Sequence, residues 1–404
     1  METGENVRPP SGTRPDQAVR GRVVTPRGVI DDGIVTVVSE RIAEVRPAGP
    51  GDEGVPRSGV VVPGYVDLHC HGGGGASFTS AVPEETAAAA DHHLRRGTTS
   101  VVAGLVTDTS DRMLAAIETA AEAADRGEVA GVLVEGPFLS TSRCGAQDPV
   151  HLRAPDVGFT KEMIDAGRGH LIAVTLAPEL PGALDVIDVL HECRITASIG
   201  HTSCDAATAD IALRRGRSQG IRGLATHLFN GMPPLHHRAP GPVAAALTAA
   251  VDRSARVELI VDGTHLDDVT ARLVLTLLPA GQIVLISDAM AAAGMPDGTY
   301  RLGPQDVRVT EGAAEIVVDG KSISIAGSTI HLADAVRRLV SCAGADLTTA
   351  VKAATETPAE LINPAGRGCE PPIGSIVEGA RADLLRLDDD LDVRHVMRRG
   401  RWVS

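Results

Sequence analysis

Eight short apolar runs along the middle of the sequence constrain the fold more than any other feature. Each run has the length and the β-branched content of a strand, and such apolar strands are typical of a parallel sheet buried on both faces. Helix-like stretches lie between most of the runs, as at 83–96, 110–127 and 267–281. Strands that alternate with helices in this number predict an α/β protein built as a (β/α)8 TIM-like barrel. The runs occupy residues 59–71, 98–106, 131–138, 171–179, 194–202, 223–230, 256–265 and 281–290.

Both flanks of the sequence carry shorter β-like runs with turn signals between them. Residues 20–60 and 370–404 are therefore expected to form one small β-sandwich domain built from both termini, and the barrel is expected to span 61–369. Residues 1–19 lack the apolar core of a signal peptide and are expected to form a flexible tail. A further β-like patch at 300–327 predicts a hairpin over the catalytic face of the barrel.

Six of the eight runs end in a side chain that can bind a metal ion or move a proton. The carboxyl ends of the strands form the active-site face of such a barrel, so these side chains are expected to meet at one rim. His69 and His71 end the first run, and residues two apart share a face of a strand, so both imidazoles are expected to point into the barrel mouth. Neutral imidazole and carboxylate are common ligands of zinc and related ions. The other members of this set are Glu135, His201, His227, His265 and Asp288.

Three features surround the pair of histidines. Cys70 lies between them and is expected to point the other way, into the packing. Gly72–Gly75 follow, and glycines there are expected to turn the chain and to let a substrate approach the backbone. Asp67 is either a partner of a metal ligand or a buried polar residue that serves the strand itself.

The charge and the cysteines of the chain limit its partners and its compartment. A net charge of −14 argues against nucleic acid and against anionic membranes, and it means that an anionic substrate needs positive groups close by. No run of about twenty apolar residues is present, so no membrane-spanning helix is expected. The six cysteines form no CxxC pair, which favours a reducing cytoplasm.

Seven short motifs, in order across nearly the whole chain, resemble those of the N-acetylglucosamine-6-phosphate deacetylases, a family of the amidohydrolase superfamily. A His-x-His pair alone is weak evidence for this family, but EGPF, HLFNGM and SDAM together are specific to it. The small β domain and the barrel expected above also fit the superfamily. The motifs are HCHGGGG at 69–75, EGPFLS at 135–140, SIGHT at 198–202, THLFNGM at 226–232, VDGTH at 261–265, SDAMAAAG at 287–294 and IAGS at 325–328.

The resemblance implies a metal centre. Glu135, His201 and His227 match the principal ligands of the family, and His69 and His71 match a pair that holds a second metal in some members. One or two divalent ions are therefore expected in each subunit. Zinc is favoured, while iron and manganese accept the same ligand types.

The resemblance also implies catalytic roles. Asp288 matches the catalytic acid–base, and His265 matches the residue that orients or polarises the substrate carbonyl. The residue types agree with this chemistry: a carboxylate can take a proton from water and give it to the leaving amine. An imidazole can stabilise the oxyanion of a tetrahedral intermediate.

Substrate contacts are implied by the same motifs. Arg238 is expected to grip the phosphate from a neighbouring subunit, which makes the enzyme a homodimer or a higher homo-oligomer. Gln147 stands where the family commonly has a His that touches the sugar, so we hypothesise that it relaxes discrimination at the sugar ring. Cys144 in the same loop is either a reactive thiol or a plain small residue. The other implied contacts are Ala146, Asn230, Gly231, His265, Ile325, Ala326 and Gly327.

The expected reaction is the metal-dependent conversion of N-acetylglucosamine 6-phosphate to glucosamine 6-phosphate and acetate, in amino-sugar catabolism and cell-wall sugar recycling. The alternative is a related N-acyl compound, such as N-acetylgalactosamine 6-phosphate. Hydrolases of cyclic amides often use a carboxylated lysine, and no lysine ends a run here. A scaffold without activity is disfavoured, because every expected ligand is present.

Overall fold

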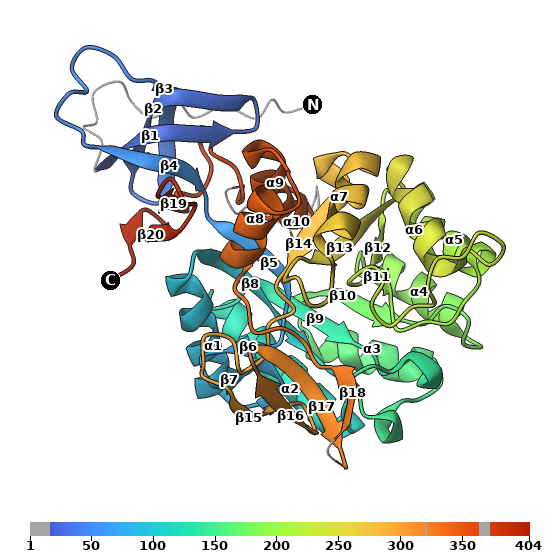
Figure 1. The fold of residues 1–404 in the computed structure, drawn as a ribbon. Coiled ribbons are helices and arrows are strands. Elements are labelled where there is room, and N and C mark those ends of the chain that lie inside the picture. Colours follow the sequence, from blue (N-terminus) through green and yellow to red (C-terminus); the bar gives the residue numbers. More distant parts are fainter. Residues whose placement is uncertain (1–16, 320, 363–371) are drawn as a thin grey trace, which may run out of the picture. The chain divides into compact units, whose positions relative to one another are not determined.

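The computed structural model describes residues 17–319, 321–362 and 372–404 (Figure 1). The described residues form two compact units. One unit combines the described residues 17–64 and 372–404, and the other comprises the described residues between 65 and 362.

The terminal unit is a seven-stranded sheet that draws strands from both ends of the chain, as the sequence predicts. Strand β4 lies between β1, to which it is parallel, and β19, to which it is antiparallel. Val19, Val35 and Leu384, from three other strands of this sheet, pack into one core on its apolar face. The sheet runs in the order β21-β20-β19-β4-β1-β2-β3. Its strands are β1 Gln17–Thr25, β2 Gly28–Val38, β3 Arg41–Pro47, β4 Arg57–Pro63, β19 Leu384–Leu387, β20 Val393–Arg398 and β21 Arg401–Trp402.

The flexible tail expected at 1–19 extends too far, because its last three residues belong to a strand. Residues 17–19 already belong to β1, where Gln17 pairs with Val37 of β2. Residues 1–16 lie outside the described part of the chain.

The larger unit is the predicted barrel, and all eight predicted runs contribute a strand to it. Neighbouring strands are parallel throughout, in the order β14-β13-β12-β11-β10-β9-β8-β5. The two ends of this sheet meet where the backbone N–H of Asp288 donates to the carbonyl of His69 at 2.9 Å. The strands are β5 Tyr65–Cys70, β8 Thr98–Leu105, β9 Gly131–Glu135, β10 Leu171–Leu176, β11 Thr196–Ile199, β12 Gly223–Ala225, β13 Ala255–Ile260 and β14 Ile283–Ile286.

The first predicted run contains two strands instead of one. Its first part is β4, which pairs within the terminal sheet, and only β5 enters the barrel. Pro63 ends β4, and a proline cannot donate a backbone hydrogen bond to continue a ladder. The Pro-Gly in the sequence therefore marks the change from one sheet to the other.

Helices follow most barrel strands, and the three predicted ones are confirmed as α1, α2 and α7. Pro83 opens α1 with Glu84 and Glu85 in the first turn, where acidic side chains favour the helix dipole. The buried stripes of these helices are rich in alanine, which lets them lie close to the sheet. The helices are α1 Pro83–Arg95, α2 Ser110–Asp125, α3 Val157–Ala166, α4 Ala183–Glu192, α5 Ala206–Arg214, α6 Gly241–Val251, α7 Asp268–Leu277, α8 Leu332–Ser341, α9 Leu347–Ala353 and α10 Glu356–Ile362.

The core of the barrel is aliphatic, as the shortage of aromatic residues requires. Leu68, Val102 and Leu133, from three adjacent strands, are completely buried and pack in one cluster with Ile260 of β13 and Ile286 of β14. No helix of the described residues has both the length and the hydropathy needed to cross a membrane.

A separate four-stranded antiparallel sheet follows β14, where the sequence predicts a hairpin. Its inner residues Val307, Val309 and Ile316 pack against Met290 of the chain after β14. This sheet brings Leu302 and Ile325 to the cavity described below. Its strands are β15 Gly298–Leu302, β16 Gln305–Thr310, β17 Ala313–Val318 and β18 Lys321–Ile325, and the smaller β6 Gly72–Gly73 and β7 Ala76–Ser77 pair after β5.

Candidate active site

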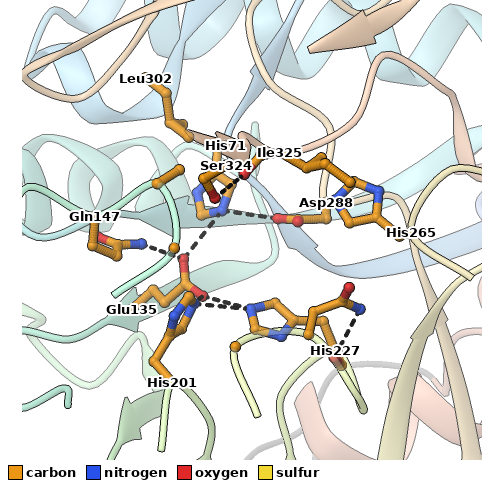
Figure 2. A pocket seen from close by; sticks show the side chains of 15 residues that line it. His71, Glu135, Gln147, His201, His227, His265, Asp288, Leu302, Ser324 and Ile325 are labelled. Carbon is orange, nitrogen blue, oxygen red and sulfur yellow. Dashed lines mark hydrogen bonds and ion pairs between the residues drawn. The ribbon is translucent and has the colours of Figure 1, made fainter. Parts of the chain in front are cut away.

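A cavity of about 220 Å³ lies at the carboxyl ends of the barrel strands. Figure 2 shows the side chains of His71, Glu135, His201, His227 and Asp288 pointing toward one another at this place. The residues that line the cavity are His71, Glu135, Gly145, Ala146, Gln147, His201, His227, Asn230, Gly231, His265, Asp288, Leu302, Ser324, Ile325 and Gly327. The side chains predicted from the strand ends thus meet at one rim.

The tightest cluster joins Glu135, His201 and His227. Glu135 Oε1 lies 2.8 Å from Nε2 of His201 and 2.8 Å from Nε2 of His227, and the two Nε2 atoms are 3.2 Å apart. All three side chains are buried. These atoms converge as the ligands of one metal ion do, and imidazole and carboxylate are ligands that divalent metal ions accept.

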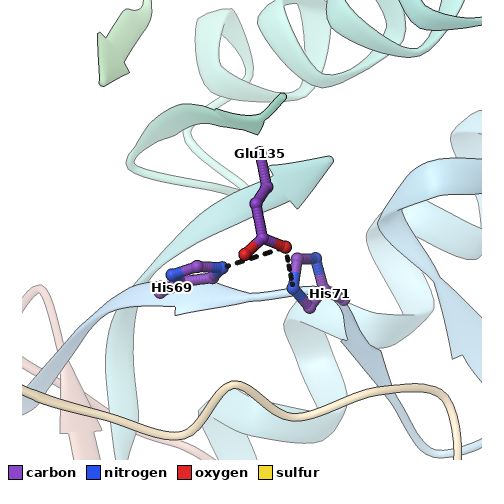
Figure 3. A group of neighbouring side chains, drawn as sticks. All are labelled: His69, His71 and Glu135. Carbon is purple, nitrogen blue, oxygen red and sulfur yellow. Dashed lines mark ion pairs between the residues drawn. The ribbon is translucent and has the colours of Figure 1, made fainter. Parts of the chain in front are cut away.

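A second cluster shares Glu135 with His69 and His71 (Figure 3). Glu135 Oε2 lies 3.6 Å from Nε2 of His71 and 3.9 Å from Nε2 of His69. Asp288 adjoins the same pair, with Oδ1 at 3.0 Å from His71 Nε2 and 3.7 Å from His69 Nε2. Glu135 therefore stands between two possible metal positions, with one oxygen toward each.

The hydrogen bonds on the far side of two of the imidazoles, those of His71 and His201, fit a bound cation. His71 Nδ1 lies 3.0 Å from the carbonyl of Gly104, and His201 Nδ1 lies 2.7 Å from the carbonyl of Arg143. A carbonyl only accepts, so both Nδ1 atoms carry a proton, and in its neutral form each imidazole presents the Nε2 lone pair that a metal ion needs. A lone pair on His201 Nε2 facing a carboxylate oxygen of Glu135 is unfavourable until a cation lies between them.

The charges of the cluster also favour a bound cation. Burial lowers the pKa of His69, but Glu258, Asp288 and Glu135 outweigh burial and raise that pKa to about 10. Burial raises the pKa of Glu135, yet the neighbouring histidines hold it well below its ordinary value. The carboxylates are therefore ionised and demand positive charge among them, which a divalent ion supplies.

Three of these residues have a backbone conformation that side chains rarely adopt. His201, His227 and Asp288 have φ of 46°, 26° and 49°, in the left-handed region. Each lies two residues beyond the end of a barrel strand and turns the chain there. Such strain costs on the order of 1–3 kcal/mol for each residue and gathers at functional sites.

His265 is held by a carboxylate. Its Nδ1 lies 2.7 Å from Oδ2 of Asp262, while Asp262 Oδ1 accepts from the backbone N–H of His265 at 2.7 Å and of Thr264 at 2.8 Å. Burial lowers the pKa of His265, but Asp262 outweighs it and raises the pKa above the ordinary value. Asp262 thus orients the imidazole and favours its charged form.

Two further carboxylates support the site, and sequence reasoning missed one of them. Glu258 Oε2 lies 3.1 Å from His69 Nδ1 and accepts from the backbone N–H of His227 at 3.1 Å. A lone Glu inside an apolar strand was the signal that could have found it. Asp67, whose role the sequence leaves open, accepts from the backbone N–H groups of His69 and Ser287 through one oxygen, and burial raises its pKa to about 6. Asp67 therefore ties β5 to the turn that carries Asp288.

The substrate contacts implied by the resemblance fall into two groups. Ala146, Asn230, Gly231, Ile325 and Gly327 line the cavity. Ala326, by contrast, is completely buried in the core of the β15–β18 sheet. Gly327 lies close to the carbonyl of Asp288, where an added Cβ would come within 2.9 Å of that oxygen. Gly145, Leu302 and Ser324 also line the cavity and were not predicted.

Two further predicted contacts lie in different surroundings. Arg238 lies on an exposed loop, where its Nη1 is 2.8 Å from Nε2 of His237, and it does not line the cavity. Gln147 lines the cavity but directs its amide at Glu135. Cys144 is half-buried, and burial raises the pKa of its thiol, which does not favour a reactive thiolate.

Gly72–Gly75 turn the chain between β6 and β7, as expected, and they are not among the residues that line the cavity. Gly74 and Gly75 donate to the carbonyls of Ala293 and Ala291. An added Cβ at Gly74 would come within 2.6 Å of the ring of His92, so the glycines permit close packing. Cys70 is fully buried and its Sγ lies 3.2 Å from His93 Nε2, which confirms that it points into the packing.

Comparison with known proteins gives the family. The model of the amidohydrolase family matches residues 60–403. An N-acetylgalactosamine-6-phosphate deacetylase of Escherichia coli O157:H7 is 33% identical, over 95% of this chain and 98% of that protein. An N-acetylglucosamine-6-phosphate deacetylase of Bacillus subtilis is 32% identical, over 94% of each.

Solved structures agree with the relatives. An N-acetyl-D-glucosamine-6-phosphate deacetylase from Mycobacterium smegmatis, in complex with N-acetyl-D-glucosamine-6-phosphate, superposes with a TM-score of 0.88 at 37% identity, over 96% of this chain and 98% of that one. The corresponding deacetylase from Thermotoga maritima gives 0.82 at 28% identity, over 96% and 99%. The chain therefore belongs to the amidohydrolase family and, within it, to the N-acetylglucosamine-6-phosphate deacetylases.

Proposed function

We propose that this enzyme hydrolyses the N-acetyl group of N-acetylglucosamine 6-phosphate, releasing acetate and glucosamine 6-phosphate. The observation that carries the proposal is the meeting of Glu135, His201, His227, His265 and Asp288 at one cavity. Amide hydrolysis needs activated water, a stabiliser for the oxyanion and an acid for the leaving amine, and this set offers all three.

Glu135, His201 and His227 would hold the principal metal ion, and His69 and His71 a second one beside Asp288. A divalent ion held there would polarise the amide carbonyl and lower the pKa of water. Zinc is the favoured ion, with iron or manganese as the other candidates.

Asp288 would act as general base and then as general acid. Its carboxylate is buried; burial raises its pKa, but His71 and His69 outweigh burial and keep it ionised at neutral pH. It can therefore take a proton from the attacking water and deliver it to the amine nitrogen as the C–N bond breaks. His265, held charged by Asp262, would donate from Nε2 to the carbonyl oxygen as negative charge develops there.

The phosphate needs a cation that one chain does not offer at this cavity. Among the described residues that line it, none is Lys or Arg. We propose that Arg238 of a second subunit supplies this charge, so the active enzyme is a homodimer or a larger homo-oligomer. The exposed position of Arg238 beside His237 supports this, because the side chain is available to another molecule.

We also propose the cytoplasm as the compartment and amino-sugar catabolism, with recycling of cell-wall sugars, as the pathway. No disulfide joins the cysteines of the described residues, which suits a reducing environment.

Acetate release tests the proposal. The purified enzyme, loaded with zinc, is given N-acetylglucosamine 6-phosphate, its unphosphorylated form and N-acetylgalactosamine 6-phosphate. We expect fast release from the first and little from the unphosphorylated sugar. The galactosamine epimer is the second candidate substrate, since a deacetylase named for it is 33% identical to this chain, beside 32% for the glucosamine enzyme of Bacillus subtilis. Faster acetate release from that epimer would make it the preferred substrate in place of N-acetylglucosamine 6-phosphate. Release from neither phosphorylated sugar would refute both candidates.

A further inference from the structure

The amide of Gln147 is bonded at both ends within the protein. Its Nε2 donates to Glu135 Oε2 at 2.7 Å, and its Oε1 accepts from the backbone N–H of Thr107 at 2.8 Å. An N–H of the backbone only donates, so the amide oxygen must face Thr107 and the amide nitrogen must face Glu135. The side chain is 5% exposed, and its orientation is therefore fixed.

Glu135 divides its two oxygens between the two histidine pairs. Oε1 lies 2.8 Å from the Nε2 atoms of His201 and His227. Oε2 lies 3.6 Å from His71 and 3.9 Å from His69, and only this oxygen receives the hydrogen bond from Gln147. Gln147 thus contacts the oxygen of Glu135 that faces His69 and His71, and not the oxygen that faces His201 and His227.

This contact has two physical consequences. A charge-assisted hydrogen bond prevents the carboxylate of Glu135 from rotating, so Oε1 stays directed at His201 and His227. The same bond neutralises part of the negative charge on Oε2, which leaves less charge for an ion beside His69 and His71. The first consequence strengthens metal binding by Glu135, His201 and His227. The second weakens metal binding beside His69 and His71.

We propose that Gln147 is a positioning residue that ranks the two metal sites, making the Glu135, His201 and His227 site the tighter one. The proposal rests on the metal centre described under the proposed function. The hypothesis that Gln147 serves the sugar ring stays a prediction, since the second N–H and one lone pair of the amide oxygen remain for a substrate.

Zinc titration of the metal-free full-length protein tests the proposal. The variants are Gln147→Met, which keeps the length of the side chain and removes both hydrogen bonds, and the control Gln282→Met. Gln282 is also 5% exposed and precedes β14, at the end of that strand away from Asp288. Titrations in the His71→Ala background remove the second site and so assign the two dissociation constants.

We expect the dissociation constant of the first zinc ion to rise about tenfold or more in Gln147→Met, in the range known for residues that orient metal ligands. The second ion should bind at least as tightly as in the wild type, and Gln282→Met should leave both constants unchanged. A first constant within twofold of the wild type, or an equal loss at both sites, would overturn the ranking role. A wild-type protein that binds no zinc would instead refute the metal centre itself.

Discussion

Asp262 offers a direct test of how the site stabilises the oxyanion. Its carboxylate is 2.7 Å from His265 Nδ1, and the two side chains are only 7% and 6% exposed. A hydrogen bond to a charged group contributes about 1.5–3 kcal/mol. If His265 acts as imidazolium, replacing Asp262 by Asn should raise the barrier by this amount, which lowers kcat roughly 10- to 150-fold.

The pH dependence of kcat should also change in Asp262→Asn, in a direction set by the pKa of His265. Asp262 holds the pKa of His265 above its ordinary value of 6.5, so the imidazolium is present below that raised pKa and is lost as pH rises through it. In Asp262→Asn the pKa falls, because the compensating charge is gone while burial remains. The alkaline limb of the kcat profile should therefore move to lower pH.

Steady-state acetate release between pH 5 and 9 (roughly the range in which histidine titrates) measures both quantities. The control is Asp267→Asn, because Asp267 caps α7 by accepting from the backbone N–H of Val269 and Asn caps a helix equally well. That variant should keep the wild-type profile. A kcat of Asp262→Asn within twofold of the wild type, with an unmoved alkaline limb, would refute the charged role of His265.

Three further variants test other parts of the site and the fold. Asp288→Asn should lower kcat by roughly 10²–10⁴ while metal content stays at the wild-type level; retained turnover would mean that another group moves the proton. Arg238→Ala should raise KM for the phosphorylated sugar by roughly 10- to 100-fold and change kcat little, and an unchanged KM would remove it from the phosphate site. Burial lowers the pKa of His93 to about 3, so the unfolded chain binds a proton between pH 6.5 and 3 that the folded protein does not. The free energy of unfolding therefore decreases as pH falls through this window. Measured by urea unfolding, it should depend less on pH in His93→Gln than in the wild type. An equal pH dependence would contradict the assignment.

The barrel could be predicted from the sequence because its determinants are local. Each strand is an apolar run with a turn signal, and the carboxyl end of a parallel strand lies at the catalytic face whatever its neighbours are. His69 and His71 could be placed on one face from their spacing alone. The change of sheet at Pro63 was also present in the sequence as a Pro-Gly, but a single apolar run suggested one strand.

The contacts that orient the site depend on the closed ring and on loop conformation. Glu258 meets His69 because β13 and β5 lie near each other only after the sheet has closed. Gln147 meets Glu135 because the loop after β9 folds back, and no periodicity records this. Asp262 is the exception, since it lies three residues before His265 in the same turn and could have been paired with it.

Dependence of acetate release on a bound metal ion tests the central claim most directly. The enzyme is stripped with a chelator, assayed on N-acetylglucosamine 6-phosphate, and assayed again after zinc is returned, with Glu135→Gln carried through the same steps. We predict that activity disappears with the metal and returns with it in the wild type, while Glu135→Gln neither holds zinc at wild-type affinity nor recovers turnover. Full activity in the demonstrably metal-free enzyme would contradict the account.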